Sequence, residues 1–403
     1  MKRKLSAALA SAALAAFAGQ AGAQISDGVV KIGVLNDMSG LYADIAGPGS
    51  VVAAKMAVED FGAARKGMKV EIISADHQNR ADVGSSIARQ WYDSDKVDVI
   101  VDVPTSSVAL AINQVTRDKG KAFLVSGAAT ADLTGKACSP NTIHWTYDTW
   151  MLANGTGQAI VKTGGDSWFF LTSDYAFGHA LERDTEAVVL KNGGKVLGKV
   201  RHPLNNQDFS SFLLQAQASK AKIIGLANAG GDTTNSIKQA AEFGIVKGGQ
   251  NLAGLLVFLT DVHSLGLEKA QGLIFTETFY WDLNDSTRAW SKRFSAQHGG
   301  RAPSMVQAGV YSAVLHYLKA VEAAKTDDGT KIIAQMKSMP TDDPLFGKGT
   351  IRADGRKLHN ALLVEVKKPS ESKGPYDYYK VRATIPANEA FRPLNAGDCP
   401  LVK

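Results

Sequence analysis

Residues 97–130 read VDVIVDVPTSSVALAINQVTRDKGKAFLVSGAAT and contain two short apolar runs with a helical pattern between them. The runs at 97–101 and 122–125 are almost wholly apolar, which is typical of parallel strands buried on both faces. Residues 108–117 repeat apolar side chains at three- and four-residue spacing, which predicts a connecting helix. The stretch therefore predicts a strand–helix–strand unit of an α/β fold.

The same alternation continues on both sides of this unit. Further strands are predicted at residues 29–35, 70–74, 168–172, 223–227 and 255–259, with helices at 53–61, 180–190, 209–218 and 233–243. After residue 278 the pattern changes to helices at 287–297, 306–324 and 331–336, and then returns to strands at 362–366 and 378–381. A chain of 403 residues is long enough for two lobes, each with its own core.

The chain is expected to cross between these lobes several times, first within residues 143–149, where a strand leads directly into a new helix. We expect the first part of lobe 1 at residues 24–146 and the first part of lobe 2 at 147–275. The second part of lobe 1 is expected at 276–346. Residues 347–403 are expected to supply the second part of lobe 2 and a C-terminal tail.

Residues 1–23 have the pattern of an export signal. Basic residues 2–4 precede an apolar stretch at 5–17, and small residues lead to a predicted cleavage after Ala23. We therefore expect a protein released into the periplasm. No cysteine stands next to the predicted cleavage site to carry a lipid, so no lipid anchor is expected.

The charge balance argues against a nucleic-acid partner. Without the three basic residues of the leader, 42 Lys and Arg stand against 39 Asp and Glu. No long basic run is present, whereas nucleic-acid binding is typically accompanied by a basic patch.

The chain has only two cysteines, Cys138 and Cys399, which excludes a cysteine-rich metal site. In an oxidising compartment we expect them to form a disulfide.

Enzyme signatures are absent from the sequence. It contains no metalloprotease HExxH, no GxSxG nucleophile turn, and no phosphate- or dinucleotide-binding glycine loop. The eight histidines are scattered. We expect no catalytic residue, no metal and no cofactor. A secreted hydrolase, which would need a nucleophile paired with a base, is the alternative class.

Hydroxyl side chains follow both strands of the opening stretch. Ser106 and Ser107 come after the first strand, and Ser126 and Thr130 flank the small residues 127–129 after the second. In a parallel sheet both loops lie at the carboxyl edge, where open α/β folds bind ligands. The hydroxyls could donate hydrogen bonds to a ligand carboxylate, or each cluster could simply cap a helix.

Two loops of the predicted second lobe lie at equivalent positions. Tyr175 and Phe177 follow the strand at 168–172, and Asp232 follows the strand at 223–227. The aromatic rings could close over an apolar ligand or fill the core. Asp232 could contact ligand, although its simplest role is to cap the next helix.

Taken in order, several segments resemble the periplasmic leucine/isoleucine/valine-binding family of ABC importers: the leader, NDMSG at 36–40, the serine loops, and DYAFG at 174–178. The resemblance covers essentially the whole mature chain. It implies a type I periplasmic binding fold, in which two doubly wound parallel-sheet lobes, joined by about three hinge crossings, close on one small molecule. It also implies permease subunits of an ABC transporter in the inner membrane as the partner.

The resemblance also assigns ligand contacts. In the first lobe they fall on Ser106 or Ser107, Ala128 and Thr130, with Tyr42 as a further contact. In the second lobe the aromatic contact falls on Phe177, with Tyr175 beside it.

One departure from the family bears on the ligand. Amino-acid binders carry an acidic residue after the strand predicted at 255–259, whereas Leu255 or Leu256 stands there and the nearest acid is Asp261. A buried ammonium without a carboxylate partner is costly. The sequence therefore favours an aromatic or other organic acid, with a branched-chain amino acid as the alternative. Ligand sensing instead of transport also stays open.

Overall fold

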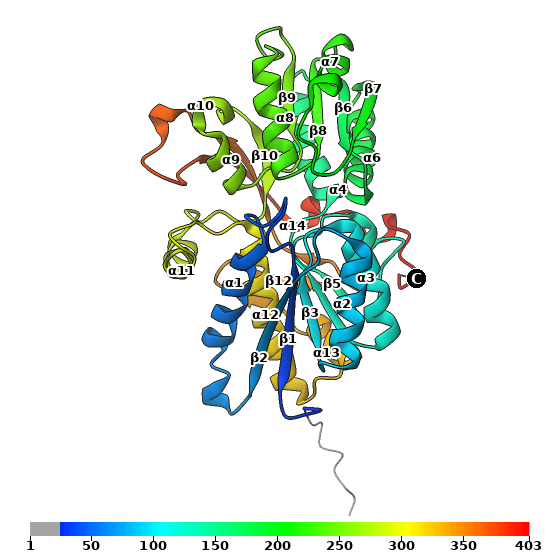
Figure 1. Ribbon diagram of the computed structural model, residues 1–403, viewed down its shortest axis with the longest axis vertical. Coiled ribbons are helices and arrows are strands. Elements are labelled where there is room, and N and C mark those ends of the chain that lie inside the picture. The colour runs from blue at the N-terminus through cyan, green and yellow to red at the C-terminus, as the bar shows by residue number, and fades with distance from the viewer. Residues whose placement is uncertain (1–24, 403) are drawn as a thin grey trace, which may run out of the picture.

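The computed structural model describes residues 25–402, so the predicted signal segment lies outside the described residues. Two lobes, each built on a parallel sheet, lie one above the other in Figure 1. The predicted α/β class and the two-lobe architecture are confirmed.

Five parallel strands form the sheet of lobe 1, in the order β2-β1-β3-β4-β5. Their bounds are β1 Val30–Asn36, β2 Val70–Asp76, β3 Val99–Asp102, β4 Ala122–Val125 and β5 Thr142–His144. The helices α1 (Gly47–Phe61), α2 (Ala81–Asp93) and α3 (Ser106–Lys119) connect the first four strands. Every residue of β3 and β4 is buried, which explains their continuous apolar runs.

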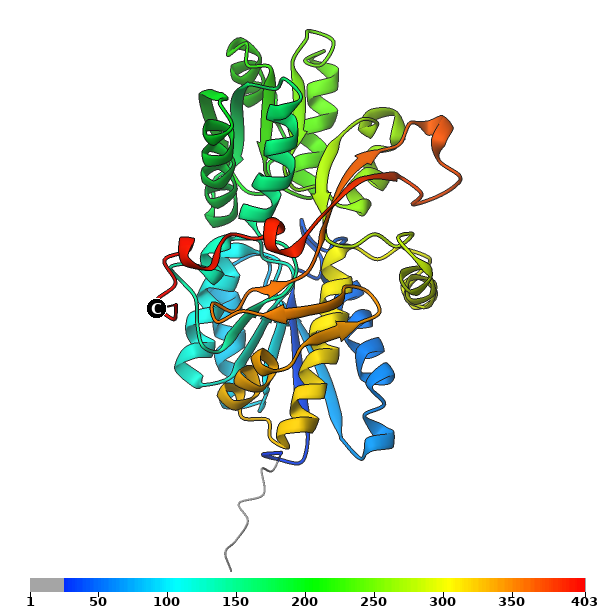
Figure 2. The same cartoon turned by 180° about the vertical axis from the view of Figure 1, so that it is seen from behind.

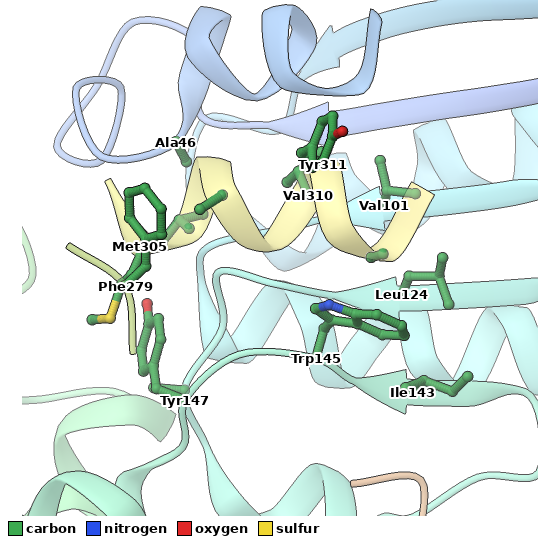
Figure 3. Close-up of a cluster of buried hydrophobic side chains, with 14 of the residues drawn as sticks. Ala46, Val101, Leu124, Ile143, Trp145, Tyr147, Phe279, Met305, Val310 and Tyr311 are labelled. Atoms are coloured by element: carbon green, nitrogen blue, oxygen red, sulfur yellow. The ribbon is translucent and has the colours of Figure 1, made fainter. Parts of the chain in front are cut away.

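A later segment of the chain completes lobe 1 with α11 (Asp285–Gln297), α12 (Met305–Ala324) and α13 (Gly329–Ser338). Nearly all of α12 is buried. Figure 3 shows this helix packed against Val101, Leu124 and Trp145 of the sheet side. A Cβ on Gly309 would lie 2.1 Å from Cγ2 of Thr146, so only glycine lets α12 approach the segment after β5 this closely.

Lobe 2 has a parallel sheet of four strands in the order β7-β6-β8-β9. Its strands are β6 Ser167–Ser173, β7 Lys195–His202, β8 Ile223–Ala227 and β9 Asn251–Gly254. Its helices are α4 Thr149–Leu152, α5 Gln158–Lys162, α6 Ala176–Lys191, α7 Ser210–Ala218, α8 Gly231–Glu242, α9 Leu259–Leu265 and α10 Leu267–Ala270. An antiparallel sheet of β10 (Ile274–Glu277), β14 (Ala361–Val366) and β15 (Tyr379–Ile385) belongs to the same lobe.

Residues 347–358 differ from their predicted place in lobe 2. The strands β11 (Thr341–Asp343), β12 (Gly347–Ile351) and β13 (Lys357–Leu358) form a small antiparallel sheet. This sheet lies beside β5, because His144 and Arg356 form a parallel bridge. Figure 2 shows these orange strands lying over lobe 1. The chain therefore returns to lobe 2 only at β14.

The buried Arg356 ties two of the crossings together. Its Nη2 donates to the carbonyl of Thr146 at 2.6 Å, and its Nη1 lies 3.4 Å from the carboxylate of Asp148. The segment after β5 and the segment before β14 are thereby held side by side.

Two strand predictions in lobe 2 differ from the structure. Residues 255–259 were predicted as a strand, but pairing with β8 ends at Gly254 and a buried loop leads into α9. This loop is apolar because it packs between the lobes, not because it joins the sheet. The edge strand β7 was not predicted, because its residues up to Arg201 alternate between exposed and half-buried and include two lysines and an arginine.

The tail after β15, which includes α14 (Ala387–Ala390), returns to lobe 1, as the red segment in Figure 2 shows. The predicted disulfide is confirmed: Cys399 is bonded to Cys138, 261 residues earlier in the chain. Arg392 donates to the carbonyl of Ala131 at 3.0 Å, which adds a second attachment.

We expect loss of this disulfide to lower the free energy of unfolding by about 3 to 5 kcal/mol, because the closed loop is very long. The measurement is urea unfolding of the wild type with and without reductant, beside Cys399→Ser. Reductant should not change the free energy of unfolding of Cys399→Ser. Equal stability of oxidised wild type and variant would contradict the prediction.

Candidate functional site

A small cavity lies where loops from both lobes meet. Its lining residues are Tyr42, Ile45, Pro104, Gly127, Ala129, Tyr147, Tyr175, Phe177, Ala229 and Leu256. The first five belong to loops after strands of lobe 1, and the last four follow strands of lobe 2. Tyr147 comes from the crossing after β5. None of the ten carries a charge.

Two tyrosine hydroxyls join the lobes across this cavity. The Oη atoms of Tyr42 and Tyr175 lie 2.6 Å apart, and the ring of Phe177 lies 5.8 Å from that of Tyr175. Burial raises the pKa of both tyrosines, most strongly for Tyr42, so the phenols remain protonated hydrogen-bond donors. Between these side chains the free space is about 10 Å³, on the scale of one water. A larger ligand therefore requires the lobes to separate or the tyrosines to rotate.

Four helices begin next to lining residues. Ile45 precedes α1, Pro104 precedes α3, Tyr175 precedes α6 and Ala229 precedes α8. None of these four helices has a side-chain cap at its amino end. Amino ends carry unpaired N–H groups and the positive end of the helix dipole. Their convergence creates an environment that favours an anion.

The loop after β4 adds further donors. The carbonyls of Gly127, Ala128 and Ala129 accept hydrogen bonds from Tyr147 Oη, His144 Nε2 and Thr149 N at 2.6, 2.7 and 2.7 Å. Within residues 25–402 the amides of the same three residues have no acceptor. Consecutive free amides suit a carboxylate.

The structure brings three of the predicted site residues together at the cavity, namely Tyr42, Tyr175 and Phe177. Six others do not line it: Ser106, Ser107, Ser126, Ala128, Thr130 and Asp232.

In both serine loops the cavity is lined by neighbours of the predicted residues, and Pro104 is the lining residue of the loop after β3. Gly127 and Ala129 line the cavity, while Ala128 packs in the core of lobe 1 and Ser126 lies against α12. Thr130 donates its amide to Ser106 Oγ at 3.2 Å, so these two residues stand just behind the lining.

Asp232 is directed away from the cavity. Its carboxylate accepts from the amides of Asn205 and Asn206 at 3.1 and 2.8 Å. Sequence reasoning missed Ile45, Pro104, Tyr147 and Ala229. Two of them carried a signal, because Tyr147 lies inside the predicted crossing and Ala229 lies in the predicted loop that contains Asp232.

Four buried carboxyl groups surround the cavity without lining it: Asp102, Asp232, Asp261 and Glu277. Burial raises the pKa of Asp102 and of Asp261 to about 7, and raises that of Glu277 well above its usual range. Asp102 accepts from Asn36 Nδ2 at 2.6 Å and Ser50 Oγ at 2.5 Å, but its Oδ1 has no partner.

Within residues 25–402 no cluster of three His, Cys, Asp or Glu residues could hold a metal ion. None of the helices in that range is both long and apolar enough to cross a membrane.

Residues 29–374 match the profile of a family described as periplasmic binding protein. The chain is 25% identical over 376 residues to Leu/Ile/Val-binding protein homolog 6 of Brucella melitensis, a match that covers 90% of this chain and 94% of the relative.

Solved structures are similar over nearly the whole chain. A periplasmic binding protein from Burkholderia mallei is 54% identical, with a TM-score of 0.91 and coverage of 94% of this chain and 100% of that one. A branched chain amino acid ABC transporter periplasmic ligand-binding protein from Burkholderia xenovorans is 42% identical, with a TM-score of 0.82 and coverage of 93% and 100%. A solute binding protein from R. palustris, in complex with benzoate, shares the fold at 22% identity, with a TM-score of 0.79 and coverage of 89% and 97%.

The raised pKa of Asp102 predicts a pH-dependent stability. The folded state holds its proton up to about pH 7, whereas an unfolded aspartate loses it near pH 3.9. The contribution of Asp102 is therefore lost as pH rises from about 4 to 7. Between pH 5 and 7 we expect the wild type to lose roughly 2 kcal/mol more than Asp102→Asn, measured by urea unfolding.

Asp82→Asn is the matched control. Asp82 is exposed, and its hydrogen bond from Arg80 lowers its pKa, so its effect falls in the acidic range. Removing the Asp82 carboxyl should leave the dependence of the free energy of unfolding on pH between 5 and 7 unchanged. An Asp102→Asn variant with the wild-type slope would refute the prediction.

Proposed function

Because the chain belongs to the periplasmic binding protein family, in the leucine/isoleucine/valine-binding group that serves ABC transporters, we propose that its interlobe cavity captures a small organic acid for import. Proteins of this family bind solutes for transporters and are not enzymes. The proposed ligand is an aromatic or other small carboxylate, and the proposed receiver is the permease of the transporter.

The observation that carries the proposal is an uncharged, aromatic-lined cavity placed at four uncapped helix amino ends. Helix dipoles and free amides favour a carboxylate, and the rings of Tyr175 and Phe177 suit an apolar body. The benzoate bound by the R. palustris protein of the same fold supports this ligand class.

Hydroxyl groups behind the lining support the same class of ligand. Ser106 Oγ accepts from the amide of Thr130, which leaves its own proton free to donate. We propose Ser106 and Thr130, with Ser107, Ser126 and Ala128 beside them, as the headgroup region once the cavity opens. Asp232 acts on the loop at 205–206 rather than on the headgroup.

Binding proceeds by lobe closure in this proposal. Ligand first contacts the loops of lobe 1, and closure brings Tyr175 and Phe177 over its apolar side. The hinge crossings allow this motion, and the ligand shifts the population only by its higher affinity for the closed form. The contact between the hydroxyls of Tyr42 and Tyr175 joins the two lobes at the place where the ligand would lie.

A branched-chain amino acid is the second candidate, favoured by the name of the 42% identical relative. Against it stands the lining residue Leu256, near the position where the resemblance places an acid for the ammonium. The surrounding carboxyl groups of Asp102, Asp232, Asp261 and Glu277 lie behind the lining.

Calorimetry with benzoate, 4-hydroxybenzoate, benzamide and leucine tests the proposal. We expect the two acids to bind at least about tenfold more tightly than leucine. Benzamide has the shape of benzoate without its charge and should bind more weakly, because the helix ends favour an anion. Tightest binding of leucine, or equal binding of benzamide and benzoate, would overturn the ligand assignment.

Leu256→Glu tests the electrostatic argument directly. A carboxylate added to the lining should weaken benzoate binding about tenfold or more and strengthen leucine binding, because it repels an anion and pairs with an ammonium. Leu256→Gln has the same size and no charge, so it separates charge from shape. Equal effects of the two variants on benzoate would count against a charge-selective site.

A further inference from the structure

A second cavity, of about 360 Å³, lies at the outer end of the cleft. Its lining comes from the loops after β1 and β2 of lobe 1 and from the loop after β7 of lobe 2. Since β2 and β7 are edge strands of their sheets, and the first crossing follows β5 at the opposite edge, this cavity lies far from that crossing.

The outer and inner cavities are separated by consecutive residues of one loop. Leu41 lines the outer cavity and its neighbour Tyr42 lines the inner cavity. Both pack against lobe 2, where a Cβ on Gly230 would lie 2.9 Å from the carbonyl of Leu41 and 3.2 Å from the Tyr42 ring. The movement of Tyr42 that admits a ring-sized ligand would also connect the two spaces.

The outer cavity presents hydrogen-bond donors, because the carboxylate of its one acidic lining residue, Asp37, already accepts hydrogen bonds from the protein. Asp37 accepts from Gly40 N, Tyr42 N and Asn79 Nδ2 at 2.7, 2.8 and 2.6 Å. The exposed side chain of Gln78 makes no hydrogen bond within residues 25–402, and that of Arg80 adds a cation paired only with exposed Asp82.

The lobe 2 wall of the outer cavity is held in place by a buried group. Asp232, 1% exposed, binds the amides of Asn205 and Asn206. This fixes the lining residue Asn205 opposite Gln78 and Asn79.

We propose that the outer cavity binds a polar, hydrogen-bond-accepting tail of the ligand whose carboxylate-bearing ring lies in the inner cavity. The inference rests on the proposed function and extends it to a substrate class, namely aryl acids with an amide, hydroxyl or similar group opposite the carboxylate. Gln78 and Asn205 select the tail, one from each lobe, so tail binding also favours the closed form.

The test compares benzoate, 4-acetamidobenzoate and 4-isobutylbenzoate by calorimetry. The last two have tails of similar size, but only the acetamido tail accepts hydrogen bonds. In the wild type we expect the acetamido acid to bind at least about fivefold more tightly than the isobutyl acid. The polar tail accepts hydrogen bonds from the donors of the outer cavity, whereas the apolar tail displaces the water that hydrates them without replacing its hydrogen bonds.

The variant for this test is Gln78→Gly combined with Asn205→Gly. Both residues have positive φ, of 54° and 61°, which glycine adopts without strain. We expect the preference for the acetamido acid to disappear while benzoate affinity stays within about twofold. Lys220→Gly, at another positive φ remote from the cleft, should change neither quantity.

The outcomes separate the two proposals. If benzoate binds but the acetamido preference is absent from the wild type or survives in the double variant, the outer cavity has no such role and the inner site stands. A double variant that loses benzoate as strongly as the acetamido acid also overturns the inference. If none of the three acids binds the wild type, the proposed function fails and the inference falls with it.

Discussion

Parallel strand pairing is the constraint on which the remaining structure depends. In lobe 1, β1 pairs with β2 and β3, and β3 with β4, all in one direction, so each strand ends at the same edge. Each connecting helix must then begin at that edge. Since lobe 2 repeats this arrangement, the two edges facing one another bring helix amino ends, and not helix carboxyl ends, to a single gap.

This arrangement explains how the gap can favour an anion with no Lys or Arg in its lining. The field comes from backbone groups fixed by the fold, and the neighbouring carboxyl groups of Asp102 and Asp261, with pKa raised to about 7, are largely protonated in mildly acidic solution. Formal charge is therefore kept out of the lining, while aromatic and small residues determine its shape. In the proposed function, the ligand class depends on a few lining side chains such as Leu256.

The sequence predicted the strands of both sheets wherever burial on two faces left a continuous apolar run. It missed both edge strands of the lobe 2 sheet. β7 has a weaker pattern, and in place of β9 the buried apolar loop that follows it was taken for a strand. The aromatic pair Tyr175 and Phe177 was identified because a strand end fixes its location. The loop after β4 was identified as a group at residues 126–130, but a loop has no periodicity that tells which of its residues face the gap, as Gly127 and Ala129 do.

The long helix α12 has a consequence for how the chain acquires its shape. It covers one face of the lobe 1 sheet, as Figure 3 shows, yet it follows the whole parallel sheet of lobe 2 in sequence. During synthesis from the amino end, the first sheet therefore waits with an uncovered apolar face until the ribosome has made most of the protein. Lobe 1 can therefore complete its core only late in synthesis, and until then its sheet exposes apolar surface of the kind that promotes aggregation.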